Sequence, residues 1–342
     1  MKNLLIFTHC SPKGTPSQGF LLARKLIQAG YSVTVLSKAL TSMGRFLDVA
    51  LKGFLETYRN DIIIVNVFGF RSFIHESLAI LYGYLFRKKS IVMIRGGWMP
   101  DFIDKWPIWT KFILSLPDFV LTPHGFLLDQ MTEKGFRIHG IIPNFIEIEK
   151  YSFRLRTKIF PKFLYLRGMH SLYNPEMTLR AFALVQSQYP DASLTMSGKD
   201  DEKNFILCRE IIKELNIRNV KILGIVPKEK IPELAQEHDI YVQSNRIDNM
   251  PITVLEMWAC GLPVVATGVD GIPYLINDGT DGVLVPSEDH QAMADTCMKL
   301  LIDPLLVERL SRNGRKNAEN FSWEQVSENW LNLIADKTIN LN

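Results

Sequence analysis

The chain has 342 residues, of which 47% are hydrophobic and 22% are charged. This length suits two domains, and the composition is typical of a folded globular protein rather than a disordered one. The four cysteines and seven histidines are scattered along the chain, with no Cys-x-x-Cys pair and no histidine cluster. This pattern argues against a disulfide framework and against a zinc site.

The apolar runs are too short for a membrane span. Residues 77–86 form one of the longest, whereas a spanning helix needs roughly 18 apolar residues or more. Residues 1–9 are too weakly apolar for a signal peptide and are expected to form a first buried strand instead. We therefore expect a cytoplasmic protein.

Charge is distributed unevenly between the two halves. Residues 1–150 carry 18 Lys and Arg against 11 Asp and Glu, whereas residues 151–342 carry 21 against 25. A basic N-terminal half favours an anionic partner, either a phosphate-bearing substrate or the inner face of a membrane. The alternative is a solvated charge excess without function.

Short apolar runs alternate with helical patterns along the whole chain, which predicts parallel sheets covered by helices. In the first half, strands are expected at 4–7, 32–36, 62–65, 91–94 and 119–122, with a helix over 19–30. Strands in the second half are expected at 163–166, 193–196, 220–223, 240–242 and 263–267. Helices there are expected at 176–189, 202–215, 230–236, 253–259, 290–301 and 323–334.

The periodicity fails between residues 143 and 156, which places a domain boundary there. We expect an N-terminal Rossmann-like domain at 1–145, which the C-terminal helix within 323–342 would complete, and a second domain at 146–322. Ligands of doubly wound sheets bind at the carboxyl ends of the strands, so we expect a cleft between the two domains.

The most informative segment runs from Ser244 to Thr267. A strand leads into a loop, a helix opens near Ile252, and Gly261 and Pro263 follow its end. Backbone amides at such a helix start form an anion site suited to a diphosphate. The carboxylates of Asp248 and Glu256 would accept strong hydrogen bonds from sugar and ribose hydroxyls.

This segment resembles the donor-site motif of retaining GT-B glycosyltransferases, in particular glycosyltransferase family 4. In that motif an acidic residue is followed after seven residues by Glu, and here Asp248 replaces the commoner Glu. Gly261-Leu-Pro-Val-Val-Ala-Thr, Gly271-Ile-Pro and Gly279-Thr-Asp-Gly-Val-Leu-Val-Pro follow in the family's order. The resemblance covers residues 140–335 closely and 1–140 loosely. It implies an α/β protein of GT-B fold, with two facing Rossmann-like domains.

The resemblance also implies a role for each matching residue. Arg167, after the strand at 163–166, would meet the donor diphosphate, Glu256 the ribose and Asp248 the donor sugar. The loop with Gly224 and Val226 would contact the base. Lys199 would either add charge or be a solvated turn lysine. The backbone that would hold phosphate or sugar comprises Asn249, Met250, Pro251, Ile252 and Thr253.

One expected cation is missing. The family usually has a Lys a few residues after the phosphate-binding Arg, but here that position holds Tyr173 or Asn174. Asn174-Pro175 is instead typical of a helix cap followed by a first-turn proline.

Four acceptor-side candidates lie in the N-terminal half. Gly14 and Gly19 belong to a loop that resembles the family's glycine-containing loop, or form a turn that caps a helix. Arg95 would bind an acceptor phosphate or pair with a carboxylate such as Asp101 or Asp104. His124, near a strand end, is either a site residue or a structural histidine.

The resemblance implies transfer of a hexosyl-type sugar from a UDP- or GDP-linked donor to a glycan or lipid-linked acceptor, in surface-polysaccharide biosynthesis. We expect no metal, no other cofactor and no nucleic acid partner, with peripheral contact to an anionic membrane. Two alternatives are a nucleotide-sugar epimerase of the same fold and a non-catalytic sugar-nucleotide-binding protein.

Overall fold

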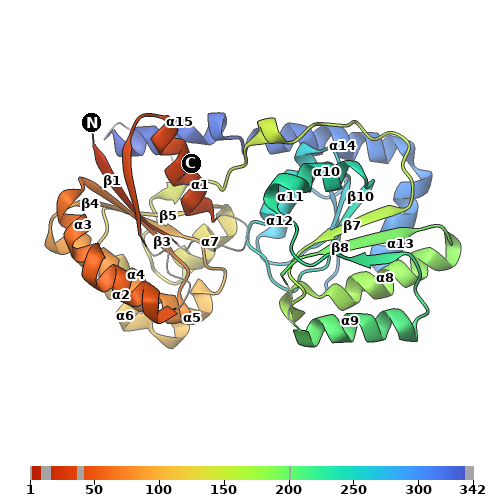
Figure 1. Ribbon diagram of the computed structural model, residues 1–342, viewed down its shortest axis with the longest axis horizontal. Helices are drawn as coiled ribbons and strands as arrows, with labels where there is room; N and C mark the ends of the chain where they lie inside the picture. Colours follow the sequence, from red (N-terminus) through yellow and green to blue (C-terminus); the bar gives the residue numbers. More distant parts are fainter. Residues whose placement is uncertain (1, 9–16, 37–41, 200–201, 336–342) are drawn as a thin grey trace. The chain divides into compact units, whose positions relative to one another are not determined.

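The computed structural model describes residues 2–8, 17–36, 42–199 and 202–335, and it divides into two compact units (Figure 1). The first unit takes in the chain up to Asn144 and the residues from Ser327 onward, and the second runs from Phe145 to Val326. Each unit contains one six-stranded parallel sheet, as the alternating pattern predicted.

The sheet of the first unit has the strand order β2-β1-β3-β4-β5-β6. The strand order reverses between β1 and β3. These two strands pair directly in parallel, and β1 also pairs with β2 on its other side. Ligands of doubly wound sheets bind at such a reversal, outside the carboxyl ends of the two strands. The strands are β1 (Asn3–Phe7), β2 (Ser32–Leu36), β3 (Ile62–Val67), β4 (Lys89–Ile94), β5 (Phe119–Thr122) and β6 (Gly140–Ile141).

Helices cover this sheet, and a buried apolar cluster that includes Val65, Phe73, Val92 and Leu127 forms the core of the unit. A continuous helical stretch follows β2 and is π-helical in its middle. The helices are α1 (Gln18–Gln28), α2 (Ser42–Leu47), η1 (Asp48–Gly53), α3 (Phe54–Arg59), η2 (Phe70–Ser72), α4 (Phe73–Leu85), α5 (Met99–Lys105), α6 (Pro107–Leu114), α7 (Gly125–Glu133) and α15 (Trp323–Ile334).

The sheet of the second unit has the order β12-β11-β10-β7-β8-β9, so its reversal lies between β7 and β10. The register pairs Phe163 with Ile240 and Leu164 with Tyr241, which brings the residues after the two strands level with each other. The strands are β7 (Lys162–Leu166), β8 (Ser193–Ser197), β9 (Val220–Ile222), β10 (Ile240–Gln243), β11 (Val264–Thr267) and β12 (Val283–Val285).

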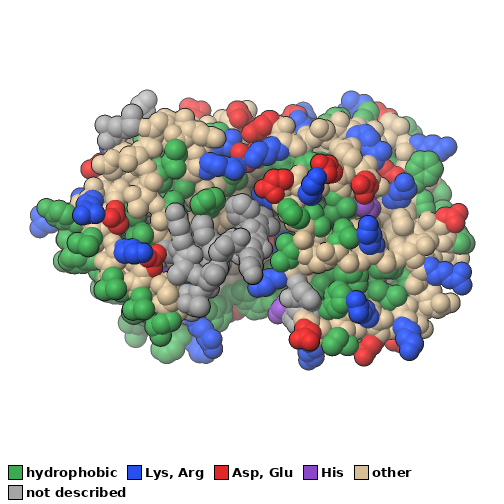
Figure 2. Space-filling model, in the orientation of Figure 1, with side chains coloured by type: hydrophobic (Ala, Val, Ile, Leu, Met, Phe, Trp, Pro, Cys, Tyr) green, Lys and Arg blue, Asp and Glu red, His purple; other side chains and the backbone are tan. Residues whose placement is uncertain are grey.

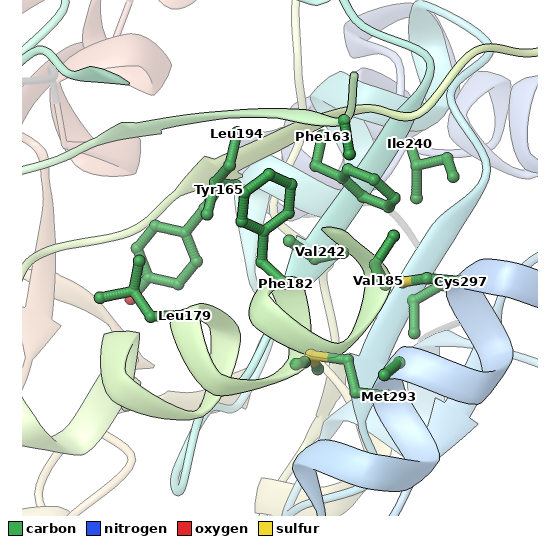
Figure 3. Packing of buried hydrophobic residues seen from close by; sticks show 14 of the residues in the cluster. Phe163, Tyr165, Leu179, Phe182, Val185, Leu194, Ile240, Val242, Met293 and Cys297 are labelled. Atoms are coloured by element: carbon green, nitrogen blue, oxygen red, sulfur yellow. The ribbon is translucent and has the colours of Figure 1, made fainter. Parts of the chain in front are cut away.

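Two apolar clusters cover the faces of this sheet. On one face Phe163, Tyr165 and Val242 pack against Phe182 of α8 and Met293 of α13 (Figure 3). On the other face, helix α11 is almost entirely buried. The helical segments are η3 (Ile148–Lys150), η4 (Ser171–Tyr173), α8 (Pro175–Gln188), α9 (Glu202–Glu214), η5 (Lys228–Lys230), α10 (Ile231–Gln236), α11 (Ile252–Ala259), α12 (Ile272–Leu275), α13 (His290–Ile302) and α14 (Pro304–Glu319).

All ten predicted strands are present, and the helix expected over 19–30 ends before Gly30 in the left-handed conformation that favours glycine. Asn174 accepts a hydrogen bond from Met177 N at the start of α8, and Pro175 occupies the first turn, as the dipeptide predicted. The short strands β6 and β12 were not predicted, and neither were the helices α2 to α7, α12 and α14.

A buried arginine holds two helix ends of the second unit in place. The guanidinium of Arg156, 2% exposed, donates to the carbonyl of Cys260 at the end of α11. It also donates to Ala235 and His238 at the end of α10, each over 2.9 Å. The carbonyls that end a helix have no partner within it, and a cation there also interacts favourably with the helix dipole.

Replacing this guanidinium with an apolar side chain of similar length is expected to destabilise the second unit. Arg156→Met leaves several buried carbonyls without a donor, so we expect its unfolding free energy in urea to fall by about 3 kcal/mol. Arg312→Met on the exposed face of α14, where Arg312 pairs with Glu308, is the matched control and should lose no more than about 1 kcal/mol. Equal losses in the two variants would contradict the role of Arg156.

Candidate functional site

Polar side chains gather where the sheet of the second unit reverses. Arg167 follows β7, and Ser244 and Asn245 follow β10, whose register with β7 puts these positions side by side. Ser244 Oγ donates to the carbonyl of Asn174 over 2.6 Å, which ties the start of α8 to the same place. The sheet topology therefore builds a polar site at the carboxyl ends of β7 and β10.

Arg167 is held on two sides. Its guanidinium carbon lies 4.4 Å from the centre of the Tyr173 ring, and its Nη2 donates to the carboxylate of Asp248. Burial lowers the pKa of Arg167, but the charge of Asp248 and smaller effects of nearby tyrosines together outweigh it and raise the pKa overall. Nε of Arg167 is buried and has no hydrogen-bond partner within the described part of the chain. One N–H of a fixed cation is thus left for a ligand.

Asp248 is fixed by its neighbours as well as by Arg167. Asn245 Nδ2 donates to its carboxylate over 2.6 Å, and its own backbone N–H donates to Asp270 over 3.1 Å. Burial raises the pKa of Asp248, and the positive charge of Arg167 opposes that shift. The side-chain oxygens of Asn245 and Asn249 are buried without a partner among the described residues.

Glu256 lies on α11 and is 2% exposed. Tyr151 Oη donates to its Oε1 over 2.6 Å, and the ammonium of Lys228 lies 3.3 Å from the same oxygen. The negative charge of Glu256, together with burial, raises the pKa of the Tyr151 phenol. Glu256 therefore has one hydroxyl and one cation as neighbours.

The two predicted carboxylates share a neighbour, Tyr241 on β10. Burial raises the pKa of its phenol well above its usual value, and the charges of Arg167, Asp248 and Glu256 all act on it. Its hydroxyl donates to Thr253 Oγ1 over 3.0 Å. Arg167, Asp248 and Glu256 thus belong to one cluster of the second unit.

The other predicted donor residues occupy more varied positions. Met250 and Pro251 are buried, and Ile252 packs against the apolar cluster. Gly224 has a positive φ, and its carbonyl accepts hydrogen bonds from Gly198 N and Ser197 Oγ, while Val226 packs against the same apolar cluster. Lys199 is exposed, and its carbonyl accepts from Met169 N.

Several residues of the cluster were not predicted as site residues. Tyr173, named only as the place of the missing Lys, stacks on Arg167. Lys228, which follows the Gly224 loop, pairs with Glu256. Tyr151 and Asp270 were missed because each reaches its partner from a distant part of the chain, and Asn245, three residues before Asp248, was missed as well. A polar residue directly after a buried strand, as at Asn245, is the one sequence signal that could have found them.

The first unit has a cavity of about 210 Å³ at its own strand reversal. Phe7 at the end of β1 and Thr8 after it lie here with Asn66 of β3 and Phe68, which follows β3. Arg45 of α2 also lines the cavity. Glu76 of α4 is 4% exposed and accepts from the backbone N–H groups of Phe68 and Gly69 over 3.1 and 3.2 Å. The cavity therefore combines apolar walls with a guanidinium and a carboxyl.

Gly19 and Arg95 lie beside this cavity. A Cβ on Gly19 would come within 2.3 Å of Thr8 Oγ1 and 2.6 Å of Asn66 Nδ2, so only glycine fits. Arg95 Nε donates to Asn66 Oδ1 over 2.5 Å, and its Nη1 donates to Asn144. Burial lowers the pKa of Arg95 to about 9.

The alternative in which Arg95 pairs with a carboxylate such as Asp101 or Asp104 is wrong. Asp104 pairs with Lys134 over 2.6 Å instead, and Arg95 has no ion pair within the described ranges. Two asparagine amides orient the guanidinium without neutralising it. Its charge therefore remains available beside Asn66.

His124 immediately precedes α7 and stacks on Phe126, with ring centres 6.1 Å apart. Burial lowers its pKa to about 4, so the ring is neutral at neutral pH. Both ring nitrogens are buried without partners among the described residues. Gly14 lies outside the described residues.

Within the described ranges, no group of three His, Cys, Asp or Glu side chains lies close enough to hold a metal ion. None of the helices in the same ranges is long and apolar enough to cross a membrane.

Residues 148–317 match the family model described as glycosyl transferases group 1. A D-inositol 3-phosphate glycosyltransferase of Corynebacterium urealyticum is 29% identical over 172 residues, which are 48% of this chain and 40% of that protein. An N-acetyl-alpha-D-glucosaminyl L-malate synthase of Bacillus anthracis is 26% identical over 203 residues, 56% of this chain and 52% of that protein. The chain thus spans about half the length of the curated relatives it matches.

Solved structures share the fold over nearly the whole chain. A sucrose-phosphate synthase from Thermosynechococcus elongatus superposes with a TM-score of 0.80 at 17% identity, covering 98% of this chain and 99% of that one. The Anabaena protein Alr3699/HepE, solved in complex with UDP-glucose, gives a TM-score of 0.77 at 14% identity, with 98% and 100% covered. These likenesses show the GT-B fold, as the resemblance implied.

The carboxyl of Glu76 makes the stability of the first unit pH-dependent. Burial raises its pKa from 4.5 to about 7. Hydrogen bonds from Ser72, Phe68 and Gly69 lower the pKa, but by less than burial raises it. Between these two pH values the folded chain keeps a proton that the unfolded chain has lost, so stability falls as pH rises, by about 3 kcal/mol in total. Glu76→Gln removes this titration.

The melting temperature of Glu76→Gln relative to that of the wild type should therefore rise between pH 4.5 and 7 and level off above pH 7. Thermal unfolding followed by circular dichroism across this range measures the difference. Glu133→Gln changes an exposed carboxylate on α7 and serves as the matched control. A difference between wild type and Glu76→Gln that does not change with pH would contradict the raised pKa.

Proposed function

This chain belongs, through residues 148–317, to the glycosyl transferases group 1 family, and from that premise we propose that it is a retaining glycosyltransferase. It would transfer a hexosyl-type sugar from a UDP- or GDP-linked donor to a glycan or lipid-linked acceptor. The observation that carries the proposal is the cluster of Arg167, Asp248 and Glu256 at the strand reversal of the second unit.

The contacts of Arg167 support a role at the donor diphosphate. Tyr173 and Asp248 fix the plane of its guanidinium, while its buried Nε is left without a partner in the described chain. A planar cation with free N–H groups binds phosphate oxygens in a defined direction. The unpartnered amide oxygens of Asn245 and Asn249 would accept hydrogen bonds from donor hydroxyls beside Asp248.

Glu256 fits the ribose, as the motif implies. Its carboxylate lies between the Tyr151 hydroxyl and the Lys228 ammonium. It belongs to α11, most of whose side chains, including that of Glu256, are buried. Lys228 follows the loop at Gly224 that would contact the base, so its charge would be near the nucleotide. We propose that Lys228 replaces the cation missing at Tyr173.

In the proposed reaction the bond between the sugar C1 and the diphosphate oxygen breaks, and a bond from the acceptor oxygen to C1 forms on the same face. The acceptor proton passes to the leaving diphosphate. Arg167 and Lys228 would stabilise the charge that develops on the diphosphate, while Asp248 orients the sugar. Fixed cations and dipoles do this efficiently because they need not reorganise during the reaction.

The cavity of the first unit supports an acceptor that carries negative charge. It is lined by Arg45 and lies next to Asn66, which in turn orients the unneutralised Arg95. Its remaining walls include Phe7, Val49 and Phe68. A phosphate-bearing, partly apolar acceptor suits these walls, and a lipid-linked precursor of a surface polysaccharide at the cytoplasmic face of a membrane would have both properties.

Binding of a nucleotide sugar should stabilise the native protein, because a ligand that binds only the folded state shifts unfolding by mass action. At a hundredfold excess over the dissociation constant, the gain is about 2.7 kcal/mol. Thermal-shift screening of UDP- and GDP-sugars measures this gain, and Asp248→Asn should lose at least about tenfold in affinity for the preferred donor.

Glu256→Gln should reduce transfer by about a hundredfold or more while the protein stays folded, because a carboxylate that accepts ribose hydroxyls becomes an amide. Glu233→Gln, which changes an exposed carboxylate in the same unit, is the control and should keep full activity. Release of free sugar from the donor without any acceptor would favour an epimerase instead. Donor binding without turnover on any acceptor would favour a non-catalytic protein.

A further inference from the structure

The helical stretch formed by α2, η1 and α3 exposes a row of large apolar side chains. Leu51 is 69% exposed and Leu55 is 55% exposed, far above what a packed helix face shows. We name this surface the α2–α3 face. Its members are Met43, Phe46, Leu47, Leu51, Leu55 and Tyr58.

The same stretch packs on the sheet with its opposite side. Val49, Gly53 and Thr57 are buried, and a Cβ on Gly53 would come within 3.3 Å of the Phe7 ring. The buried residues are four apart, and the exposed residues Met43, Leu47, Leu51 and Leu55 are also four apart, so the stretch is apolar on two sides. Packing within this unit explains the apolar side that faces the sheet, but not the exposed apolar side.

Aromatic and basic side chains continue the α2–α3 face at the end of α4. Tyr58 contacts Phe86, with ring centres 5.7 Å apart, and the Lys88 ammonium lies 5.8 Å from the Tyr58 ring centre. Lys88 is flanked by Arg87 and Lys89. The exposed rings and the three consecutive cations thus lie next to each other.

The acidic residues of the stretch do not oppose this positive charge. Asp48 pairs with Lys52 over 2.7 Å, and Glu56 pairs with Arg59 over 3.2 Å. The stretch has three basic residues against two acidic ones, before Arg87, Lys88 and Lys89 are added. In Figure 2, hydrophobic and basic side chains gather where Figure 1 shows α2, α3 and α4.

We propose that the α2–α3 face docks on the surface of an anionic lipid bilayer. Exposed leucines beside tyrosine rings and a basic edge match the apolar boundary and the negative headgroups of such a surface. A protein partner would also cover the leucines, but the charge complementarity favours anionic headgroups. The helices lie on the unit rather than crossing a bilayer, in keeping with the absence of a spanning helix among the described residues.

The helical stretch that carries the α2–α3 face also lines the cavity of the first unit. Arg45 and Val49 line that cavity and belong to the same helical stretch as Leu47 and Leu51. If the proposed function holds, a lipid-linked acceptor could reach the cavity while its apolar chain remains in the bilayer. The docking itself rests on the exposed face alone and not on the proposed function.

Flotation with lipid vesicles tests the proposal. The full chain should float with vesicles of phosphatidylglycerol and phosphatidylcholine in equal parts, more weakly at high salt, and weakly with phosphatidylcholine alone. Leu51→Ser combined with Leu55→Ser should bind at least about tenfold more weakly, because two apolar side chains no longer enter the interface. Arg87→Gln combined with Lys88→Gln should also lose about tenfold or more on anionic vesicles.

The matched control is Ile302→Ser combined with Leu305→Ser, which changes two residues of the second unit that are 74% and 80% exposed. This variant should float like the wild type. Absence of wild-type flotation, or equal flotation of the Leu51/Leu55 variant, would overturn the proposal. Self-association that this variant abolishes, without vesicle binding, would assign the face to a second copy.

A thermal-shift measurement with UDP-glucose accompanies each variant. The substituted residues lie outside the Arg167 cluster, so donor binding should not change. Loss of flotation with intact donor binding therefore concerns the α2–α3 face, whereas intact flotation without any donor binding would concern the proposed function.

Discussion

The structure of the second unit depends on the buried guanidinium of Arg156. Two helices, α10 and α11, end close together at the same place, and each leaves carbonyl groups that its own backbone cannot satisfy. A guanidinium offers five N–H donors in one plane and can serve both ends at once. Burial lowers the pKa of Arg156 to about 10, and it stays a cation at neutral pH. The position of α11, and with it that of Glu256, follows from this arrangement.

Arg156 also connects the segment that precedes β7 to the sheet of the second unit. Its Nε lies 3.8 Å from Asp239, which precedes β10 and accepts from Arg154 over 2.7 Å and from Phe160 N over 3.0 Å. The extended residues around 154–160 are thereby fixed without secondary structure of their own. Tyr151, earlier in the same segment, reaches Glu256 as a result. The buried guanidinium of Arg156 thus positions both α11 and the Tyr151 hydroxyl, which contacts the Glu256 carboxylate on that helix.

Both units place their polar groups according to the same topological rule. In each sheet the chain leaves neighbouring strands in opposite directions at the reversal, so helices diverge and leave space at the carboxyl ends. The second unit fills this place with Arg167, Asn245 and Asp248, whereas the first surrounds a cavity with Thr8, Asn66 and Glu76. The fold determines where ligands can bind, and the side chains determine which ligands fit.

The sequence predicted the strands well because fully buried parallel strands are short apolar runs, such as Ile62 to Val67 with its single Asn66. It did not predict β6 and β12, which have two and three residues and too little pattern to detect. The spacing of Asp248 and Glu256 pointed to the polar cluster through resemblance. Lys228 and Tyr151 were missed because their contacts with Glu256 arise only from tertiary packing.

The resemblance implies a Lys where this chain has Tyr173 or Asn174, and without that Lys the charges of the cluster are balanced in pairs. With two cations near one carboxylate, the site would carry uncompensated positive charge inside the protein, which is costly to bury. With Tyr173, the guanidinium of Arg167 has one ring beneath it and one carboxylate beside it, so its charge is balanced and its plane is fixed. Lys228 and Glu256 form a second balanced pair nearby. An anionic ligand that entered this cluster would meet two cations already oriented by their partners, and little of its binding energy would be spent on ordering them.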